Sequence, residues 1–148
     1  MVSIDLVTVE DMARVLEIEV GSFFPPWTFD AFYDELDRDD SFFAVARDGD
    51  VLGFVILRRM GDDGEIINIA VDESARRRGI GDMLVRAALR CADENALESV
   101  FLEVRPSNDA AIALYTKHGF KPVRLIKDYY TDPLEDALVM AFGYISAD

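Results

Sequence analysis

The run Glu65–Val71 is the segment that most constrains the fold of this chain. Its residues are rich in β-branched side chains and are apolar apart from Glu65 and Asn68. A run of this kind is typical of a strand in the interior of a sheet, buried on both faces. Both faces can be covered only if other elements pack on each side of the sheet. The sequence therefore predicts a layered α/β domain with this strand near its centre.

The neighbouring segments follow strand and helix periods in alternation. Asp48-Gly49 separates two apolar runs, 41–47 and 51–59, and this dipeptide predicts a β-hairpin. Asn108 stands where a helix N-cap is expected, and Gly119 where that helix ends. The predicted order is β-α-α-β-β-β-α-β-α-β-β. Further strands are predicted from Ile4 and at 99–104, 121–129 and 137–144, and helices run through Met12, Phe29, Met83 and Ala111.

Length and charge narrow the class of protein. The 148 residues correspond to one domain, which we expect to span residues 1–148. Asp and Glu number 29 against 15 Lys and Arg, which gives a formal net charge of −14 at pH 7. This charge disfavours binding to nucleic acid or to anionic membranes, both of which attract basic proteins. It is compatible with a solvated acidic surface or, alternatively, with a basic substrate.

Cysteine and histidine are each present once, as Cys91 and His118. A single cysteine forms no disulfide framework, which indicates a reducing compartment. The two residues are also too few for a His/Cys zinc site or for catalysis by several histidines, and we expect no metal. No apolar run approaches the ~20 residues of a bilayer-spanning helix, and residues 1–11 lack the basic and apolar regions of a signal peptide. We therefore expect a cytoplasmic protein without membrane association.

A basic loop that contains glycines follows the central strand, with the sequence Arg76-Arg77-Arg78-Gly79-Ile80-Gly81. It precedes a predicted helix, whose N-terminus carries about half a positive charge. Three arginines there repel one another and the helix end, and a bound anion would stabilise the arrangement. Free N–H groups and glycines that permit close approach would complete a phosphate site. The alternative is a solvated basic turn, and the loop fits neither a P-loop nor a dinucleotide-binding fingerprint.

The loop also resembles the acetyl-CoA pyrophosphate loop of the GNAT acetyltransferase superfamily, which has the pattern Arg/Gln-x-x-Gly-x-Gly/Ala after an apolar strand. Four further blocks, in the same order along the chain, resemble the RimI-type protein N-terminal acetyltransferases of this superfamily. These blocks are Asn68–Val71, Leu102–Asn108, Ala111–Phe120 and the segment from Asp128 to Ala137. The resemblance covers nearly the whole chain and is densest from Glu65 to Phe142.

The resemblance implies a GNAT fold, an α/β (α+β) arrangement with one mixed sheet of about seven strands and about four helices. In this fold the fourth and fifth strands, here Glu65–Val71 and Ser99–Val104, splay apart, and acetyl-CoA lies in the gap. Backbone groups of the fourth strand would bind the pantetheine arm, and the Val71 N–H would polarise the thioester carbonyl. The implied residues for acetyl-CoA binding are Ile69, Ala70, Val71, Arg76, Arg77, Arg78, Gly79, Ile80, Gly81, Asn108 and Tyr115.

Two side chains are implied as catalytic by the same resemblance. Glu103 interrupts an apolar strand, and a carboxylate in such a place requires a partner or a chemical task. Its spacing is compatible with facing solvent or pairing with Arg105, whereas the resemblance implies a general base for the incoming amine. Tyr115 shares a helical stripe with Ala111 and Ile112, which is typical of a core position. By the resemblance, its hydroxyl protonates the departing thiolate.

Aromatic residues at two places are implied as walls of a peptide slot. One place is the loop around Phe24 and Trp27, whose two prolines cannot continue a helix. The other is the strand end at Tyr129 and Tyr130, which ordinary β-propensity also explains. The implied substrate-binding residues are Phe24, Trp27, Asn68, Tyr129 and Tyr130.

Three more polar or reactive residues have structural explanations. Asn108 is suited to capping a helix, a role that is compatible with contacting acetyl-CoA as well. His118 falls in the last turn of a predicted helix, where a cation favours the helix dipole. Cys91 lies on the inner face of a helix, where we expect a small core residue and not a nucleophile.

The resemblance implies transfer of the acetyl group of acetyl-CoA to the N-terminal α-amine of a protein. The substrate would be a ribosomal protein or a nascent chain, near the ribosome, and attack would be direct, in a ternary complex. Two alternatives stay open. One is an acetyltransferase for lysine side chains or a small amine. The other is a CoA-binding interaction module without catalysis.

Overall fold

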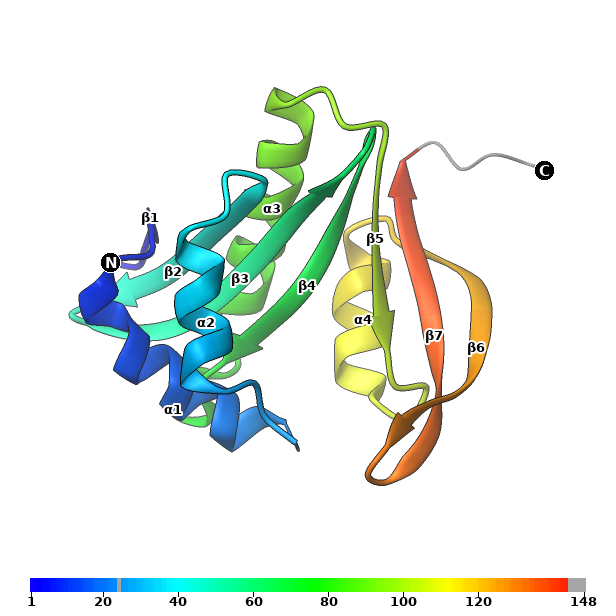
Figure 1. Cartoon of the computed structure of the whole chain (residues 1–148), viewed down its shortest axis with the longest axis horizontal. Helices are drawn as coiled ribbons and strands as arrows, with labels where there is room; N and C mark the ends of the chain where they lie inside the picture. Colours follow the sequence, from blue (N-terminus) through cyan, green and yellow to red (C-terminus); the bar gives the residue numbers. More distant parts are fainter. Residues whose placement is uncertain (24, 144–148) are drawn as a thin grey trace.

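A seven-stranded sheet with the order β1-β2-β3-β4-β5-β7-β6 forms the centre of the protein (Figure 1), in a computed structural model that describes residues 1–23 and 25–143. The strands are β1 (Ser3–Leu6), β2 (Ser41–Asp48), β3 (Asp50–Met60), β4 (Asp63–Val71), β5 (Ser99–Val104), β6 (Lys121–Thr131) and β7 (Leu134–Gly143). The helices are α1 (Met12–Ser22), α2 (Phe29–Leu36), α3 (Ile80–Glu94) and α4 (Asp109–Lys117), with short 3-10 turns at Val9–Asp11 and Glu73–Ala75. The order of elements along the chain is the predicted one.

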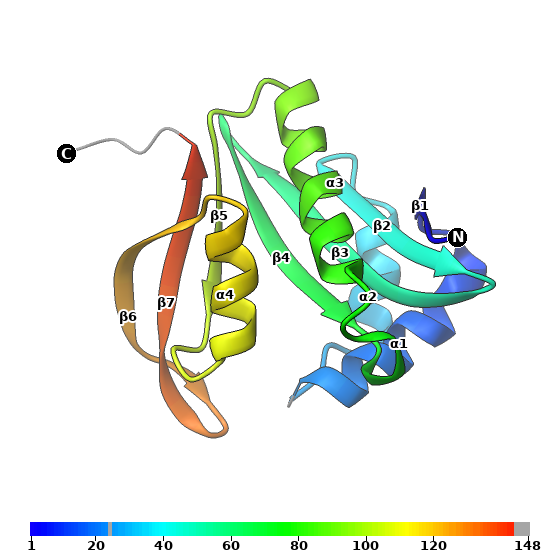
Figure 2. The same cartoon turned by 180° about the vertical axis from the view of Figure 1, so that it is seen from behind.

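Helices cover both faces of the sheet (Figures 1 and 2). α1 and α2 pack on one face of β2–β4, whereas α3 and α4 lie on the opposite face. The larger core lies between the sheet and α3 and includes Val55 and Leu84. The core under α1 and α2 is built around Phe32, which is fully buried edge-on against Phe54. Within residues 1–23 and 25–143, no helix is long and apolar enough to cross a bilayer.

β4 occupies the fourth of the seven positions in the sheet, as its sequence predicts. Ile66 packs into the core under α3, and Ala70 packs into the core under α1 and α2, which means that both faces of β4 are covered. Ile67 and Ile69 are only half-buried, because a cleft opens beside them. The central strand is therefore less completely buried than a run of apolar residues suggests.

β4 and β5 separate after a short paired stretch. They pair in parallel only through Gly64 and Glu65 on the β4 side. In contrast, β4 stays paired with β3 as far as Val71, and β5 with β7 as far as Val104. Both ribbon views show the two strands diverging from their paired end. The predicted splay is confirmed, and the facing edges of β4 and β5 have no strand partner beyond this point.

Short-range signals in the sequence account for the ends of the helices. The hydroxyl of Thr28 accepts a hydrogen bond from the Ala31 N–H at 3.1 Å and caps α2. The side chain of Asn108 caps α4 in the same way, by accepting from the Ala111 N–H at 3.1 Å. Gly119 follows α4 with a φ of 94°, a left-handed conformation that glycine adopts without strain.

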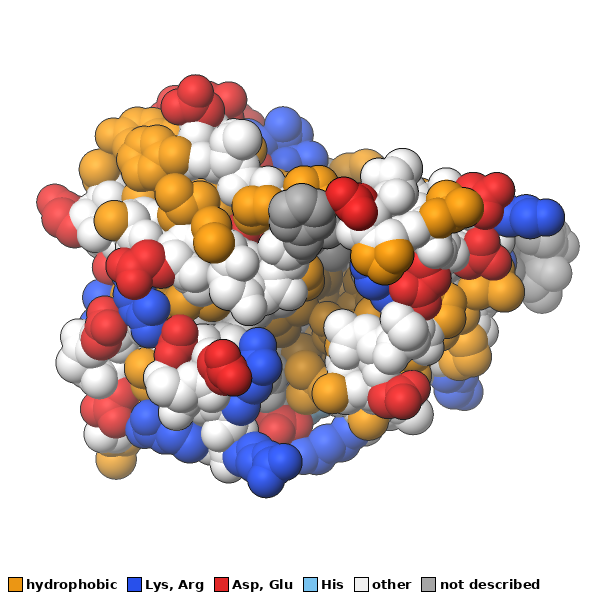
Figure 3. Space-filling model, turned by 90° about the horizontal axis from the view of Figure 1, so that it is seen from below, with side chains coloured by type: hydrophobic (Ala, Val, Ile, Leu, Met, Phe, Trp, Pro, Cys, Tyr) orange, Lys and Arg blue, Asp and Glu red, His pale blue; other side chains and the backbone are white. Residues whose placement is uncertain are grey.

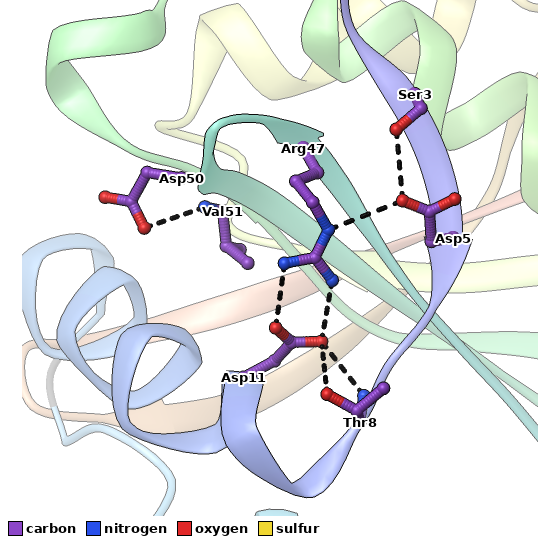
Figure 4. Close-up of polar contacts among 7 residues, drawn as sticks. All are labelled: Ser3, Asp5, Thr8, Asp11, Arg47, Asp50 and Val51. Carbon is purple, nitrogen blue, oxygen red and sulfur yellow. Dashed lines mark hydrogen bonds and ion pairs between the residues drawn. The ribbon is translucent and has the colours of Figure 1, made fainter.

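A buried carboxylate joins the start of α1 to β2 (Figure 4). Asp11 is 6% exposed, and its two oxygens accept hydrogen bonds from Arg47 at 3.0 and 2.9 Å. One oxygen also accepts from the Thr8 N–H at 2.9 Å, and Arg47 reaches the exposed Asp5 at 3.4 Å. The hydrogen bonds from Arg47 first, and then from Thr8, hold the pKa of Asp11 below its usual value against the opposing effect of burial.

We expect Asp11→Asn to lower the free energy of unfolding at neutral pH by about 2 kcal/mol, because it removes the charge from a buried, bidentate pair. The folded-state pKa of Asp11 lies below the ~3.9 of an unfolded aspartate. Its stabilising contribution is therefore complete above about pH 5 and is lost as the pH falls through the folded value. Urea denaturation across this pH range measures both effects. Asp5→Asn, which removes an exposed contact to the same Arg47, is the control, and equal losses in the two variants would contradict the prediction.

Candidate active site

A cleft of about 590 Å³ opens where β4 and β5 diverge. One wall comes from β4 and the connection between α1 and α2, and the other from β5, α4 and the β6–β7 hairpin. Seen from below, the molecule is hollowed between these two halves, and Lys and Arg side chains gather along one rim of the hollow (Figure 3). The predicted site residues that line the cleft are Trp27, Asn68, Ile69, Glu103, Asn108, Tyr115, Tyr129 and Tyr130.

The remaining predicted residues lie beyond this lining. Ala70 and Val71 continue β4 past the cleft, and the loop Arg76–Gly81 follows next to them. A Cβ atom on Gly81 would lie 4.0 Å from Val71 Cγ2, so the end of β4 and the loop are in contact. Phe24, which was predicted for the peptide slot, lies outside the described residues.

Glu103 reaches the cleft because of strand alternation in β5. Leu102 and Val104 point into the core under α3, which places Glu103 on the opposite face, half-buried in the lining of the cleft. Arg105 forms its ion pair with Glu135 at 3.3 Å and not with Glu103. The alternative of a Glu103–Arg105 pair is therefore wrong.

Tyr115 enters the cleft from α4. Its side chain is 7% exposed and packs on Phe120 with ring centroids 5.8 Å apart, so the residue belongs to the core as well as to the cleft. Burial first, and then the charge of Tyr130, raises the pKa of Tyr115 well above the ordinary tyrosine value of about 10. The hydroxyl is therefore protonated throughout the physiological pH range and is a hydrogen-bond donor.

A second carboxyl group lies beside Glu103. Glu65 faces Phe101 in the last bridge between β4 and β5, and its carboxyl group is within hydrogen-bonding reach of Glu103. Burial first, and then the contact with Glu103, raises the pKa of Glu65 to about 7. Nothing in the local sequence around Glu65 indicates this contact, because it depends on the register of two strands that are distant in the chain.

The arginine–glycine loop has a conformation suited to an anion. Arg77 and Gly79 have left-handed φ values of 68° and 76°, and α3 begins at Ile80. Left-handed residues in a turn direct backbone N–H groups to one side, and the first N–H groups of a helix lack intrahelical acceptors. Gly81 also has a packing role, since a Cβ there would lie 3.1 Å from Leu114 Cδ2 of α4 and the leucine side chain would have to shift.

The residues present fit acetyl-CoA, which has a pyrophosphate at one end of an arm that carries amides. The loop with its N–H groups and arginines suits the pyrophosphate. The edge of β4 beyond Glu65, without a strand partner on the β5 side, offers backbone groups to the amides of the arm. Arg78 is already engaged, because its guanidinium pairs with Asp48 at 3.1 Å.

Aromatic side chains stand on both walls of the cleft. Trp27 packs on Phe32 with ring centroids 5.1 Å apart, on the side of α1 and α2. On the opposite wall, the rings of Tyr129 and Tyr130 meet edge-on at 4.9 Å, and the Arg105 guanidinium lies 4.3 Å from the centre of the Tyr130 ring. Both aromatic walls are therefore held in place by packing against neighbouring side chains.

Glu19 of α1 is a residue of the site that sequence reasoning missed. It is 1% exposed and lines the cleft, where its oxygens accept hydrogen bonds from Asn68 Nδ2 at 2.7 Å and from the Trp27 N–H at 2.9 Å. Burial raises the pKa of Glu19, and these two hydrogen bonds oppose the shift. A signal was present, because a glutamate next to Ile18 extends the apolar stripe of α1 that includes Val15.

Arg105 is the second residue that was missed as part of the site. Its Nη1 donates to the Pro133 carbonyl at 2.9 Å and to Glu135 at 3.3 Å, and its Nη2 donates to the Asp132 carbonyl at 3.4 Å. These contacts, with the stacking on Tyr130, hold the β6–β7 hairpin against the end of β5. Arg105 therefore fixes one wall of the cleft.

We expect Arg105→Ala to raise the KM for a peptide substrate about 10-fold, which corresponds to ~1.4 kcal/mol, because charge-assisted hydrogen bonds of this kind contribute on that scale. The KM for acetyl-CoA should change much less, since Arg105 acts on the opposite wall from β4. Steady-state kinetics with each substrate varied in turn measure both constants. Arg124→Ala, an exposed change on β6, is the control, and a similar rise in both KM values for Arg105→Ala would contradict the prediction.

His118 and Cys91 both lie in structural surroundings and are not among the residues that line the cleft. His118 Nε2 lies 2.8 Å from Asp82 Oδ1, and the Lys117 ammonium contacts the same oxygen at 3.0 Å. The end of α4 is thereby joined to the first turn of α3. Cys91 is half-buried at the border of the larger core, and burial raises the pKa of its thiol.

Both the sequence and the fold have relatives among known proteins. Residues 12–120 match the acetyltransferase (GNAT) family. An N-alpha-acetyltransferase of Sulfurisphaera tokodaii is 35% identical over 150 residues, covering 92% of this chain and 87% of that protein. The ribosomal protein bS18-alanine N-acetyltransferase of Escherichia coli K12 is 32% identical over 133 residues, covering 88% and 90%. The crystal structure of the ribosomal-protein-S18-alanine N-acetyltransferase from Escherichia coli matches with a TM-score of 0.88 at 30% identity, covering 100% of this chain and 97% of that one.

The split sheet, the cleft between its two halves and the arginine–glycine loop after β4 define an acyltransferase that uses acetyl-CoA. The chain belongs to the GNAT acetyltransferase family. The fold expected from the resemblance is therefore the fold observed.

Proposed function

We propose that this enzyme acetylates the N-terminal α-amine of a protein. The observation that carries the proposal is the meeting of Glu103 and Tyr115 in one cleft, between the diverging strands and between aromatic walls. The relatives from Sulfurisphaera tokodaii and Escherichia coli are named for acetylation of this kind of amine, which supports the proposal. A ribosomal protein that begins with alanine is the first candidate substrate.

In the proposed reaction, acetyl-CoA supplies an acetyl group activated as a thioester. Glu103 accepts a proton from the amine nitrogen as that nitrogen bonds to the carbonyl carbon. The Val71 N–H donates a hydrogen bond to the carbonyl oxygen. Tyr115 donates to the sulfur as the carbon–sulfur bond breaks. Because burial raises the pKa of Tyr115 still further above the ~8.5 of a thiol, hydrogen bonding to the thiolate contributes more than complete proton transfer.

We propose binding roles for the two walls of the cleft and for the loop that follows β4. In this proposal the arm of acetyl-CoA lies along the backbone of Ile69, Ala70 and Val71, near Asn108, and the peptide lies between the aromatic walls. We assign the pyrophosphate to Arg76, Arg77, Arg78, Gly79, Ile80 and Gly81, where the Arg78 guanidinium would have to leave its exposed pair with Asp48 or Arg78 would act through its backbone. We assign contact with the peptide to Trp27, Asn68, Tyr129 and Tyr130 and, outside the described residues, to Phe24. Cys91 is not among the residues that line the cleft, which supports direct attack without an acyl-enzyme.

The acid–base properties of the amine favour an N-terminus over a lysine. An α-amine with a pKa of ~7.8 is roughly 14% neutral at pH 7, whereas a lysine with a pKa of ~10.4 is roughly 0.04% neutral. A single carboxylate base is therefore better matched to the α-amine. Lysine side chains and small amines are the competing substrates that an experiment has to separate.

The test is mass spectrometry of products from a peptide library with acetyl-CoA. Each peptide is offered with a free and with a blocked N-terminus, each contains an internal lysine, and the first two residues are varied. We expect acetylation at the free α-amine and at least 100-fold less at lysine in the blocked peptides. Equal rates on blocked peptides would replace the proposal with a lysine acetyltransferase, and the absence of any product would favour a CoA-binding module.

We further propose that residues 1–148 act as one N-acetyltransferase domain in the cytoplasm, near the ribosome. The substrate in the name of the Escherichia coli relative supports this location. The net charge of −14 would also attract a basic protein substrate. Co-sedimentation with ribosomes at low and high salt tests the association, which should weaken as salt screens the charges.

A further inference from the structure

Glu65 has a carboxyl group beside Glu103, and the proposed reaction gives this group no role. We propose that Glu65, in its protonated form, donates a hydrogen bond to Glu103 and holds that carboxylate in its working orientation. This inference rests on the proposed function, because it takes Glu103 as the base. Glu65 is a positioning residue and not a catalytic one, since Glu103 lines the cleft and Glu65 does not.

The register of the sheet brings the two carboxyl groups together. Glu65 faces Phe101 in the last bridge between β4 and β5. Glu103 is two residues beyond Phe101, and side chains two apart in a strand point to the same face. Diagonal neighbours on adjacent strands are close enough for long side chains to interact. The two carboxyl groups therefore meet at the point where the cleft opens, within hydrogen-bonding reach.

The nearest charged and titratable neighbours of Glu65 and Glu103 do not neutralise this pair of carboxyl groups. Arg58 stands opposite Glu65 on β3, but its guanidinium is ion-paired with Glu35 of α2 at 2.5 Å. Tyr129 of β6 is neutral at physiological pH, because burial first, and then the charges of Glu103 and Glu65, raises its pKa. Neither neighbour therefore supplies a positive charge that fully neutralises the two carboxylates. A proton shared between the two carboxyl groups relieves their repulsion instead.

The other groups on this side of the cleft have partners of their own. Arg105 stacks on Tyr130 and bonds to Glu135, and burial raises the pKa of Tyr130 to about 12. Glu19 of α1 accepts hydrogen bonds from Asn68 and from the adjoining loop. These contacts do not compete with Glu65 for Glu103.

The direction of the pH dependence follows from the pKa of Glu65, which is raised to about 7. Below that pH, Glu65 is mostly neutral and donates to the Glu103 carboxylate. Above it, Glu65 ionises, the donor is lost and the two carboxylates repel each other. A glutamine at position 65 donates at every pH and is not affected by this ionisation.

The experiment compares kcat and KM of wild type, Glu65→Gln and Glu65→Ala from about pH 6 to 9. Dividing kcat/KM of each variant by kcat/KM of the wild type at the same pH cancels the titration of the substrate amine. We expect the ratio of kcat/KM for Glu65→Gln to be constant below about pH 7 and to rise several-fold above it. Glu65→Ala should lower kcat about 10-fold below pH 7 with little change in the peptide KM. A flat ratio for Glu65→Gln, or equal losses of kcat for the two variants at low pH, would overturn the proposal.

Asp63→Asn is the matched control. Asp63 is on the same face of β4 and accepts a hydrogen bond from the Ser99 hydroxyl of β5 at 2.7 Å, away from Glu103. Asp63→Asn perturbs the same pair of strands. We expect the ratio of its kcat/KM to that of the wild type to be independent of pH. The same rise as in Glu65→Gln would assign the effect to strand pairing and would overturn the role of Glu65.

A second readout separates this inference from the proposed function. Carbon-13 NMR of the glutamate carboxyl groups, without substrate, should show Glu65 titrating near pH 7 in the wild type and at lower pH in Glu103→Gln. An unchanged midpoint in Glu103→Gln would overturn the pairing. An intact pairing in an enzyme that acetylates no free N-terminus would instead overturn the proposed function and leave the carboxyl pair standing.

Discussion

Glu103→Gln is expected to lower kcat for a peptide with a free N-terminus by roughly 100- to 1,000-fold, because glutamine cannot accept the proton of the amine. The KM values for peptide and acetyl-CoA should change little, since the amide fills the same volume in the cleft. The loss should shrink as the pH rises toward the pKa of the α-amine and beyond, where more of the substrate is already neutral. Initial rates from about pH 6.5 to 9.5 measure both the size and the pH dependence of the effect.

Glu98→Gln is the control for this variant. Glu98 is an exposed residue directly before β5, so its change removes a carboxylate from the same region of the chain without reaching the cleft. We expect wild-type kinetics for Glu98→Gln. Wild-type kinetics for Glu103→Gln as well would show that another group accepts the proton.

Tyr115→Phe is expected to lower kcat roughly 10- to 100-fold, because the departing sulfur loses its hydrogen-bond donor. The ring contact with Phe120, at 5.8 Å between centroids, is retained by phenylalanine, so the melting temperature should be unchanged. Release of the CoA thiol, followed by a thiol-specific dye, measures the rate. Since burial raises the pKa of Tyr115, wild-type activity should show no loss from ionisation of this group up to about pH 10.

Tyr33→Phe on α2 serves as the control for Tyr115→Phe, because Tyr33 is 41% exposed. It removes a hydroxyl group from the protein without touching the cleft. Equal rates for Tyr115→Phe and wild type would mean that the sulfur is stabilised by a different donor. A fall in melting temperature together with a fall in rate would indicate that the hydroxyl is needed for packing.

The order and position of the helices and strands could be predicted because their signals are local. Asp48-Gly49 between two apolar runs, the caps at Thr28 and Asn108, and Gly119 after α4 each depend on a few neighbouring residues. The structure has the elements at these places. The split between β4 and β5 was expected from the family resemblance and not from periodicity, because no local pattern marks where two distant strands stop pairing.

The side chains of the site were predictable where a motif carried them, and not where tertiary contacts did. Glu103 and Tyr115 belong to segments that resemble the family, and both line the cleft. Glu19 and Arg105 were missed as site residues because their roles depend on tertiary contacts, Glu19 with Asn68 of β4 and Arg105 with Pro133 between β6 and β7. The contact of Glu65 with Glu103 depends on strand register, which composition does not determine.

Because β4 and β5 pair only briefly, the sheet has two further unpaired edges in its interior, one on β4 and one on β5. These are in addition to the edges at its outer strands β1 and β6. An open border of a sheet normally invites strands of other proteins and starts aggregation. The two interior edges are protected from pairing with other proteins, because the two halves of the sheet stay joined at Gly64 and Glu65. An extended molecule with amide groups can bind between these edges in the manner of an additional strand. While it is bound, it would connect the two half-sheets to each other.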